Sequence, residues 1–89
     1  MTDLKIGQIV ISKAGRDKGE WFVVLSICDD GQHVMLTNGR TRPIGRPKRK
    51  KIKHIQPTHN VDARLRQDIL DKKNLTDADF RNAIKNAKS

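Results

Sequence analysis

The chain contains 89 residues with a hydrophobic fraction of 35%, so it has room for one small domain but not for a deep substrate cavity. Nineteen Lys and Arg residues against ten Asp and Glu residues give a net charge of +9, which favours a polyanionic partner, either nucleic acid or an anionic membrane surface. The single cysteine excludes an internal disulfide, and no apolar signal core or membrane-spanning run is present. We therefore expect a soluble, cytoplasmic protein that is not an enzyme and does not bind membranes.

The first half of the chain predicts short β-strands joined by turns. β-Branched and apolar residues favour strands at three segments, residues 7–12, 20–28 and 33–37. The two glycines within residues 13–19 indicate a turn between the first two strands, and Asp29-Asp30-Gly31 indicates the next turn.

A hairpin is expected after the third strand. Asn38-Gly39 is typical of a type I′ turn, so residues 40–44 are expected to pair back as a fourth strand. Gly45 and Pro47 interrupt that strand, and residues 51–56 form a short fifth strand that ends at Pro57. Five strands at this spacing predict a small antiparallel barrel over residues 1–57.

The remaining residues, 58–89, change to a helical period and form a C-terminal extension. Val61, Leu65, Ile69 and Leu70 predict a helix over residues 61–73, with Asn60 as its N-cap and Asn74 as its end. Thr76 is expected to cap a second helix, with Asp79 at the capping-box position. We expect the first helix to dock on the barrel. The second helix has only two large apolar residues, Phe80 and Ile84, so it is expected to bury less and to be the more mobile or partner-dependent one.

The positive charge is concentrated in one segment. Residues 40–57 carry eight basic and no acidic side chains, while residues 1–39 have a net charge of −1 and residues 58–89 have +2. Such a concentration is typical of a binding face rather than of general solubility.

Residues 7–24 resemble the KOW motif of ribosomal large-subunit proteins and bacterial transcription elongation factors. In that family, a turn of the form Gly-basic-Asp-basic-Gly joins two strands, and residues 15–19 (GRDKG) match it position by position. The resemblance implies an SH3-like barrel of the KOW type that binds RNA, such as ribosomal RNA, as a ribosomal-protein-like component or a ribosome-associated translation factor. Phe22 stands where the family often has glycine.

The residue types alone, apart from the family resemblance, also favour binding to the phosphates of a nucleic acid. Two glycines let the backbone turn tightly and approach a phosphate, and the Arg and Lys side chains between them supply positive charge. Asp17 can tie this turn by accepting hydrogen bonds from backbone N–H groups. The basic run at residues 46–51 is expected to be a loop that shares one face with the turn at residues 13–19, where it can form phosphate contacts along a nucleic-acid backbone. The candidate RNA-binding residues are Lys13, Gly15, Arg16, Asp17, Lys18, Gly19, Arg40, Arg42, Arg46, Lys48, Arg49, Lys50, Lys51, Lys53 and His54.

Several alternatives remain open from the sequence. The turn can be an ordinary β-turn with solvated charges, and the basic run can be a solubility or targeting segment. A membrane-surface role is disfavoured because no amphipathic apolar face accompanies the charge. The main alternative function is a protein-interaction module that docks on ribosomal or polymerase proteins through the barrel and the helical tail. DNA is not distinguished from RNA by charge, and the free protein is expected to be a monomer.

Other residue types give weaker signals. Trp21 can stack on an unpaired base, but a half-buried core position is the favoured interpretation. Cys28 is expected to be a small apolar strand residue. The spacings of His54 to His59 and of Cys28 to His33 do not match a zinc site, and no catalytic constellation is visible, so neither a metal nor a cofactor is expected.

Overall fold

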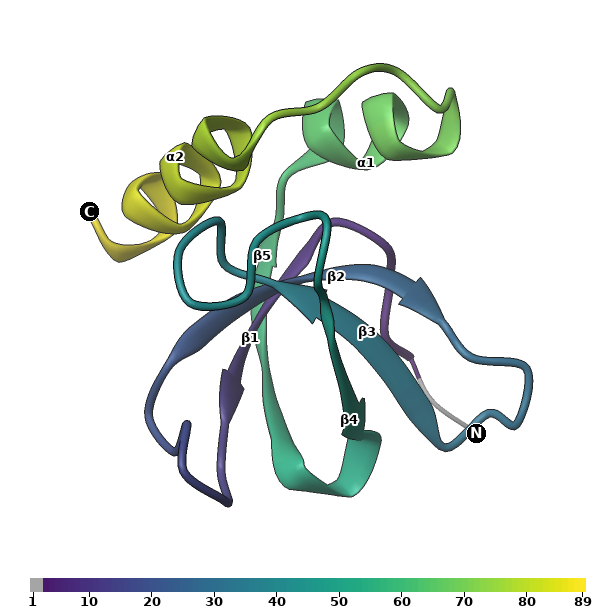
Figure 1. Ribbon diagram of the computed structural model, residues 1–89, viewed down its shortest axis with the longest axis vertical. Coiled ribbons are helices and arrows are strands. Elements are labelled where there is room, and N and C mark those ends of the chain that lie inside the picture. Colours follow the sequence, from purple (N-terminus) through teal and green to yellow (C-terminus); the bar gives the residue numbers. More distant parts are fainter. Residues whose placement is uncertain (1–2) are drawn as a thin grey trace.

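The computed structural model describes residues 3–89, which form one antiparallel sheet with two helices on one of its faces (Figure 1). The strand order is β4-β3-β2-β1-β5, and each neighbouring pair is antiparallel. The elements are β1 (Gln8–Ser12), β2 (Trp21–Ile27), β3 (His33–Thr37), β4 (Lys48–Lys51), the 3₁₀ turn η1 (Ile52–His54), β5 (Ile55–Val61), α1 (Ala63–Leu70) and α2 (Asp77–Lys88). The prediction of a mainly β protein with a helical tail is confirmed.

Alternation along the strands builds two separate apolar clusters. Val10 and Phe22 point to the inner face of the curved sheet, where they pack with residues of β3 and β5. Their chain neighbours Ile9 and Val23 point to the outer face and pack under the helices. The central strands β1 and β2 are therefore buried on both faces, which is why their sequences are almost continuously apolar.

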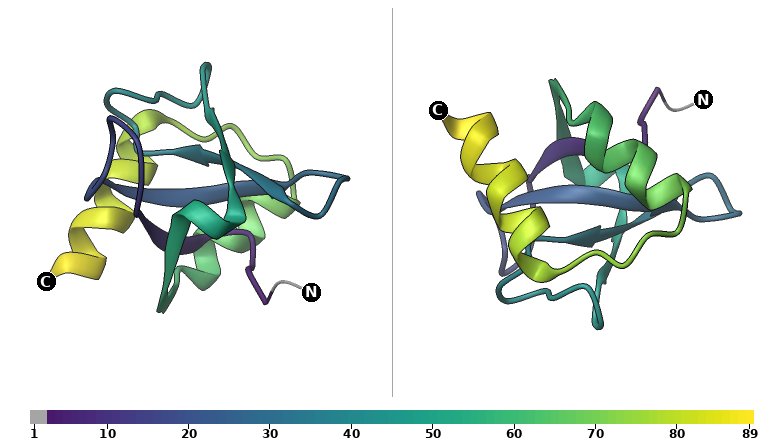
Figure 2. Two further views of the ribbon diagram at one scale, coloured as in Figure 1. Left: turned by 90° about the horizontal axis from the view of Figure 1, so that it is seen from below. Right: turned by 90° about the horizontal axis from the view of Figure 1, so that it is seen from above.

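The two edge strands, β4 and β5, follow each other in the chain and are joined only by η1. Figure 2 shows that the sheet is curled, with η1 leading from one edge strand to the other. Within residues 3–89, no ladder joins β4 to β5, so the sheet is open at this junction and a closed barrel is not shown.

The prediction of a fourth strand at residues 40–44 is wrong. The side chain of Asn38 takes over the backbone donors that a strand would use: its Oδ1 accepts from the backbone N–H of Arg40 at 2.9 Å and of Arg42 at 3.0 Å. Of the Asn38-Gly39 pair, only Gly39 has a positive φ, +72°, so the expected type I′ turn does not form either. The segment is a loop closed on itself.

The fourth strand lies instead in the basic run that was expected to be a loop. Lys48 pairs with Leu36 of β3, and Lys51 pairs with His33. The fifth strand also differs from its prediction, because it starts at Ile55 and continues through Pro57, which pairs with Val10. An edge strand can accommodate a proline, since one of its sides makes no ladder.

The helix boundaries differ in part from the predictions. Asp62, not Asn60, caps α1, because its side chain accepts a hydrogen bond from the backbone N–H of Leu65 at 2.9 Å. This helix ends at Leu70, before the predicted stop at Asn74. The cap of α2 is confirmed: Thr76 is the N-cap, and the Asp79 carboxylate accepts from its backbone N–H at 2.8 Å.

The expectation that the second helix buries less is wrong. Phe80, Ala83 and Ile84 of α2 are all buried against the sheet, whereas α1 buries only Leu65 and leaves Leu70 44% exposed. No helix within residues 3–89 has the length and apolar character needed to cross a membrane.

Two glycines allow the helices to lie this close. A Cβ atom on Gly39 would stand 2.3 Å from the backbone oxygen of Asp77, at the start of α2. A Cβ atom on Gly7 would stand 2.8 Å from Cβ of Arg66 in α1. Both glycines also have positive φ. A side chain at either position is therefore disfavoured both by the close contact and by the backbone conformation.

Candidate nucleic-acid interface

The turn at residues 13–19 joins β1 to β2 and is closed by backbone hydrogen bonds. Gly19 N–H donates to the carbonyl of Ser12 at 2.9 Å, and Lys18 N–H donates to the carbonyl of Gly15 at 3.2 Å. Gly15 and Gly19 have φ values of +85° and +90°, which other residues rarely adopt. The two glycines of the motif are thus required by the backbone of the turn itself.

A largely buried ion pair joins this turn to β4. The ammonium of Lys50 lies 2.7 Å from Oδ1 of Asp17 and donates to the carbonyl of Ala14, also at 2.7 Å. The Ser12 hydroxyl lies 2.7 Å from the same carboxylate oxygen and donates to it. Only 8% of the Lys50 side chain and 15% of the Asp17 side chain are exposed. The pair therefore fixes residues 13–19 against the basic strand.

The protonation of Asp17 reflects these contacts. Burial raises the pKa of this carboxyl, but the hydrogen bonds from Lys50 and Ser12 and the charges of Lys50 and Lys48 outweigh it and lower the pKa below the ordinary value. Asp17 was expected to tie the turn through backbone N–H groups, and its partners are side chains instead. Most of the Asp17 and Lys50 side chains is therefore shielded from solvent.

Around this pair, the turn and β4 form a hollow of about 640 Å³, here called the basic hollow. Its cations come from β4 and are exposed to different degrees: Arg49 and Lys51 are exposed, and Lys48 is half-buried. The hollow is lined by Ala14, Gly15, His33, Lys48, Arg49, Lys50, Lys51 and His54.

A second hollow of about 350 Å³ adjoins the basic hollow and shares Gly15, Lys48 and Lys50 with it. Arg16 of the turn and Arg42 of the loop before β4 contribute to its lining. The structure thus brings together most of the cations that the sequence indicated on the turn and on β4.

Other candidate residues lie away from the basic hollow. Arg40 lines a separate hollow beside Trp21, and Lys53 lines a hollow beside η1. Lys13, Lys18 and Arg46 are exposed but line none of these hollows. Lys13 is still tied to the site, because its N–H donates to the carbonyl of His54 at 2.8 Å.

Sequence reasoning missed Asp30 and His33. The Asp30 carboxylate lies 2.6 Å from Nδ1 of His33 and accepts from the Arg49 guanidinium at 3.2 Å. The backbone N–H of Gln32, which donates to Asp30, together with the bonds from His33, lowers the pKa of Asp30 to about 2 despite partial desolvation. In the sequence, Asp30 is visible only as a turn residue before the third strand. Its position beside Arg49 depends on the pairing of β3 with β4, which the sequence does not show.

His54 lies among lysines at the end of η1. Desolvation, and then the positive charges of Lys53 and Lys51, lowers the pKa of His54. Its imidazole is therefore neutral at pH 7, where one ring nitrogen donates a hydrogen bond and the other accepts one.

Trp21 is half-buried, as expected, and the ammonium of Lys88 lies 5.2 Å from its ring centroid. Cys28 follows β2 and is partly exposed, so its assignment to a strand is wrong. Between residues 3 and 89, no three His, Cys, Asp or Glu side chains are grouped in a way that could hold a metal ion.

No protein-family model matches the chain, and no curated protein has a matching sequence. The interface is therefore argued from its own residues.

Proposed function

We propose that this protein binds RNA through phosphate contacts made by the turn at residues 13–19 and by β4. The observation that carries the proposal is the buried Lys50–Asp17 pair, which holds the turn against a strand whose other three residues are all basic. A fixed group of cations costs less ordering entropy on binding than the same cations on a mobile loop.

The cations of β4 differ in what they offer to a phosphate. Arg49 is 60% exposed, and its planar guanidinium suits bidentate contacts; its pair with Asp30 is exposed and easily exchanged. Lys48 and Lys51 act as point charges beside it. Gly15 lines the hollow and carries no side chain that would keep a backbone phosphate away.

The finer proposal is a KOW-type protein that acts on structured RNA, such as ribosomal RNA, as a ribosomal-protein-like or ribosome-associated component of translation in the cytoplasm. Two features support it. The GRDKG turn lies between two antiparallel strands, as in the KOW motif. The order β4-β3-β2-β1-β5, with both edges joined by one 3₁₀ turn, is compatible with an SH3-like barrel.

The test is a titration of the ¹⁵N-labelled protein with an RNA hairpin, followed by backbone amide chemical shifts. We expect the largest shifts at Gly15 to Gly19 and at Lys48 to Lys51, with smaller ones in α1 and α2. Shifts confined to the helices, or no shifts at low salt, would overturn the proposal.

A further inference from the structure

Beside η1, where β4 ends, lies a hollow of about 560 Å³, here called the Ile52 hollow. Its volume falls within the range of about 300–1,000 Å³ that holds small organic ligands. Residues from four parts of the chain line it: Asp3, Leu4, Gln8, Gly31, Gln32, Lys51, Ile52, Lys53 and Pro57.

We propose that the Ile52 hollow receives one unpaired nucleobase of the bound RNA. The inference rests on the proposed function and adds to it a preference for RNA with an unpaired nucleotide beside a duplex. A base has two apolar faces, a polar edge and a phosphate attached through the sugar. The hollow offers a counterpart to each of these.

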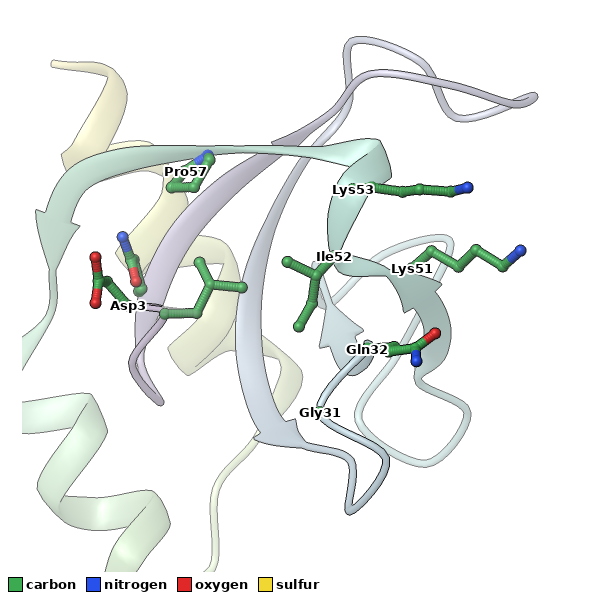
Figure 3. Close-up of a pocket in the computed structure, with 9 residues that line it drawn as sticks. Asp3, Gly31, Gln32, Lys51, Ile52, Lys53 and Pro57 are labelled. Atoms are coloured by element: carbon green, nitrogen blue, oxygen red, sulfur yellow. The ribbon is translucent and has the colours of Figure 1, made fainter. Parts of the chain in front are cut away.

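Apolar side chains supply the walls. Figure 3 shows Ile52 pointing into the hollow and the ring of Pro57 at its upper border. Leu4, which also belongs to the inner core cluster, adds a third apolar contact. Burial of the faces of a base against such walls is favourable whichever base is present.

Polar groups border the hollow on two sides. The Asp3 carboxylate lies on one side, and the Gln32 amide lies on the other, where it extends in the same direction as the Lys51 and Lys53 side chains (Figure 3); both Asp3 and Gln32 are exposed. An amide both donates and accepts, and a carboxylate accepts from base N–H groups. The Gln8 amide is already engaged, with Lys5 N–H at 2.9 Å and the Thr58 carbonyl at 2.8 Å, so it forms a fixed part of the lining.

The charges continue from the basic hollow into this one. Lys51 lines both hollows, and Lys53 stands at the same rim. In Figure 3, both ammonium groups extend away from the hollow, where they would meet the phosphates on either side of an inserted base. A backbone that crosses the basic hollow therefore reaches the Ile52 hollow over Lys51.

The rim is also held in place. The backbone N–H of Ile52 donates to the carbonyl of Gln32 at 2.8 Å, which ties η1 to the turn before β3. The base would enter a largely formed site, which lowers the entropy lost on binding.

The experiment uses the full chain and two RNA hairpins that differ only in one bulged nucleotide, which carries 2-aminopurine. We expect about tenfold tighter binding of the bulged hairpin, because the faces of the extra base bury apolar surface against Leu4, Ile52 and Pro57. The emission of 2-aminopurine should rise on binding, because the base leaves the RNA stack and no aromatic residue lines the hollow. Quenching of this emission by iodide should fall.

The variant Ile52→Ala should reduce the preference for the bulged hairpin to less than about threefold while leaving binding of the plain hairpin intact. The control is Leu70→Ala, an exposed apolar residue on α1, which should keep the full preference. If Ile52→Ala does not fold, Asp3→Ala, which removes an exposed carboxylate from the lining of the hollow, should lower the preference about threefold.

The outcomes separate the two proposals. Equal affinity for both hairpins, or unchanged emission, together with salt-dependent binding would overturn the base site and leave the phosphate interface standing. If the wild-type protein binds neither hairpin at low salt, both the proposed RNA-binding function and the base site are overturned.

Discussion

The helix-covered face of the sheet and the end where the 13–19 turn meets β4 are stabilised in different ways. Under α1 and α2, apolar side chains close the contact, and Gly7 and Gly39 let the helix backbones approach the sheet. At the turn, a lysine and an aspartate are buried together, and the cations around them stay exposed. The first region contributes chiefly to folding, whereas the second joins a structural contact to a charged surface.

Strand geometry explains how one basic run both makes a structural contact and forms a charged surface. Side chains alternate along β4, and Lys50 is buried between Arg49 and Lys51, which are exposed. Four consecutive basic residues therefore do not form one equivalent set. The predictions below ask whether stability and binding separate along this division.

The largest expected effect is on the helix-covered face. Deleting residues 75–89 should abolish cooperative unfolding, because Phe80 and Ile84 would no longer cover β2. The single substitution Phe80→Ala should lower the free energy of unfolding by about 3–5 kcal/mol. The control Leu70→Ala, at an exposed position, should cost less than about 0.5 kcal/mol. Thermal unfolding followed by circular dichroism measures all three, and a normal transition in the deletion would show that α2 is dispensable.

The next effect separates two lysines of the same strand. Lys50→Met should lower the free energy of unfolding by about 3 kcal/mol, because Asp17 would be left buried without its cation. Lys51→Met, one position along and exposed, should change it by less than about 0.5 kcal/mol. Urea denaturation gives both values. Equal losses would mean that Lys50 has no special structural role.

A smaller effect is expected in acid. The pKa of Asp17 is lower in the folded protein than in the unfolded chain, so its stabilising contribution is present above the ordinary carboxyl pKa and is lost as pH falls through the folded value. The gap in stability between the wild type and Lys50→Met should therefore narrow as the pH falls below about 4. Urea denaturation at a series of pH values checks this, and a gap independent of pH would argue against the ion pair.

The sequence predicts the central part of this fold well, because β1, β2 and β3 are β-branched and bounded by turn residues. It also predicts that the turn and the basic run converge. It does not predict that KRKK at residues 48–51 forms a strand, since lysine has little intrinsic preference for strands and is common on exposed edges. The burial of Lys50 depends on strand register, which no local pattern contains.

The docking of the helices was misjudged for a related reason. The count of large apolar residues predicts that α1 buries more than α2. That count takes no account of the sheet surface against which each helix packs. Gly39 allows the first turn of α2 to approach the sheet, and its role becomes visible only with the Asp77 backbone beside it. Likewise, Asn-Gly usually indicates a hairpin, and here the Asn38 side chain closes a loop instead.

The most direct test of the account compares two triple variants that remove the same charge. One is Lys48→Gln with Arg49→Gln and Lys51→Gln, which keeps Lys50, and the control is Arg64→Gln with Lys72→Gln and Lys85→Gln on and beside the helices. Affinity for an RNA hairpin is measured over a range of salt concentrations. The account predicts that the β4 variant stays folded and that its salt slope falls by about two to three units, while the control keeps the wild-type slope. Equal losses in the two variants would show that net charge, and not the surface held by Lys50 and Asp17, governs binding.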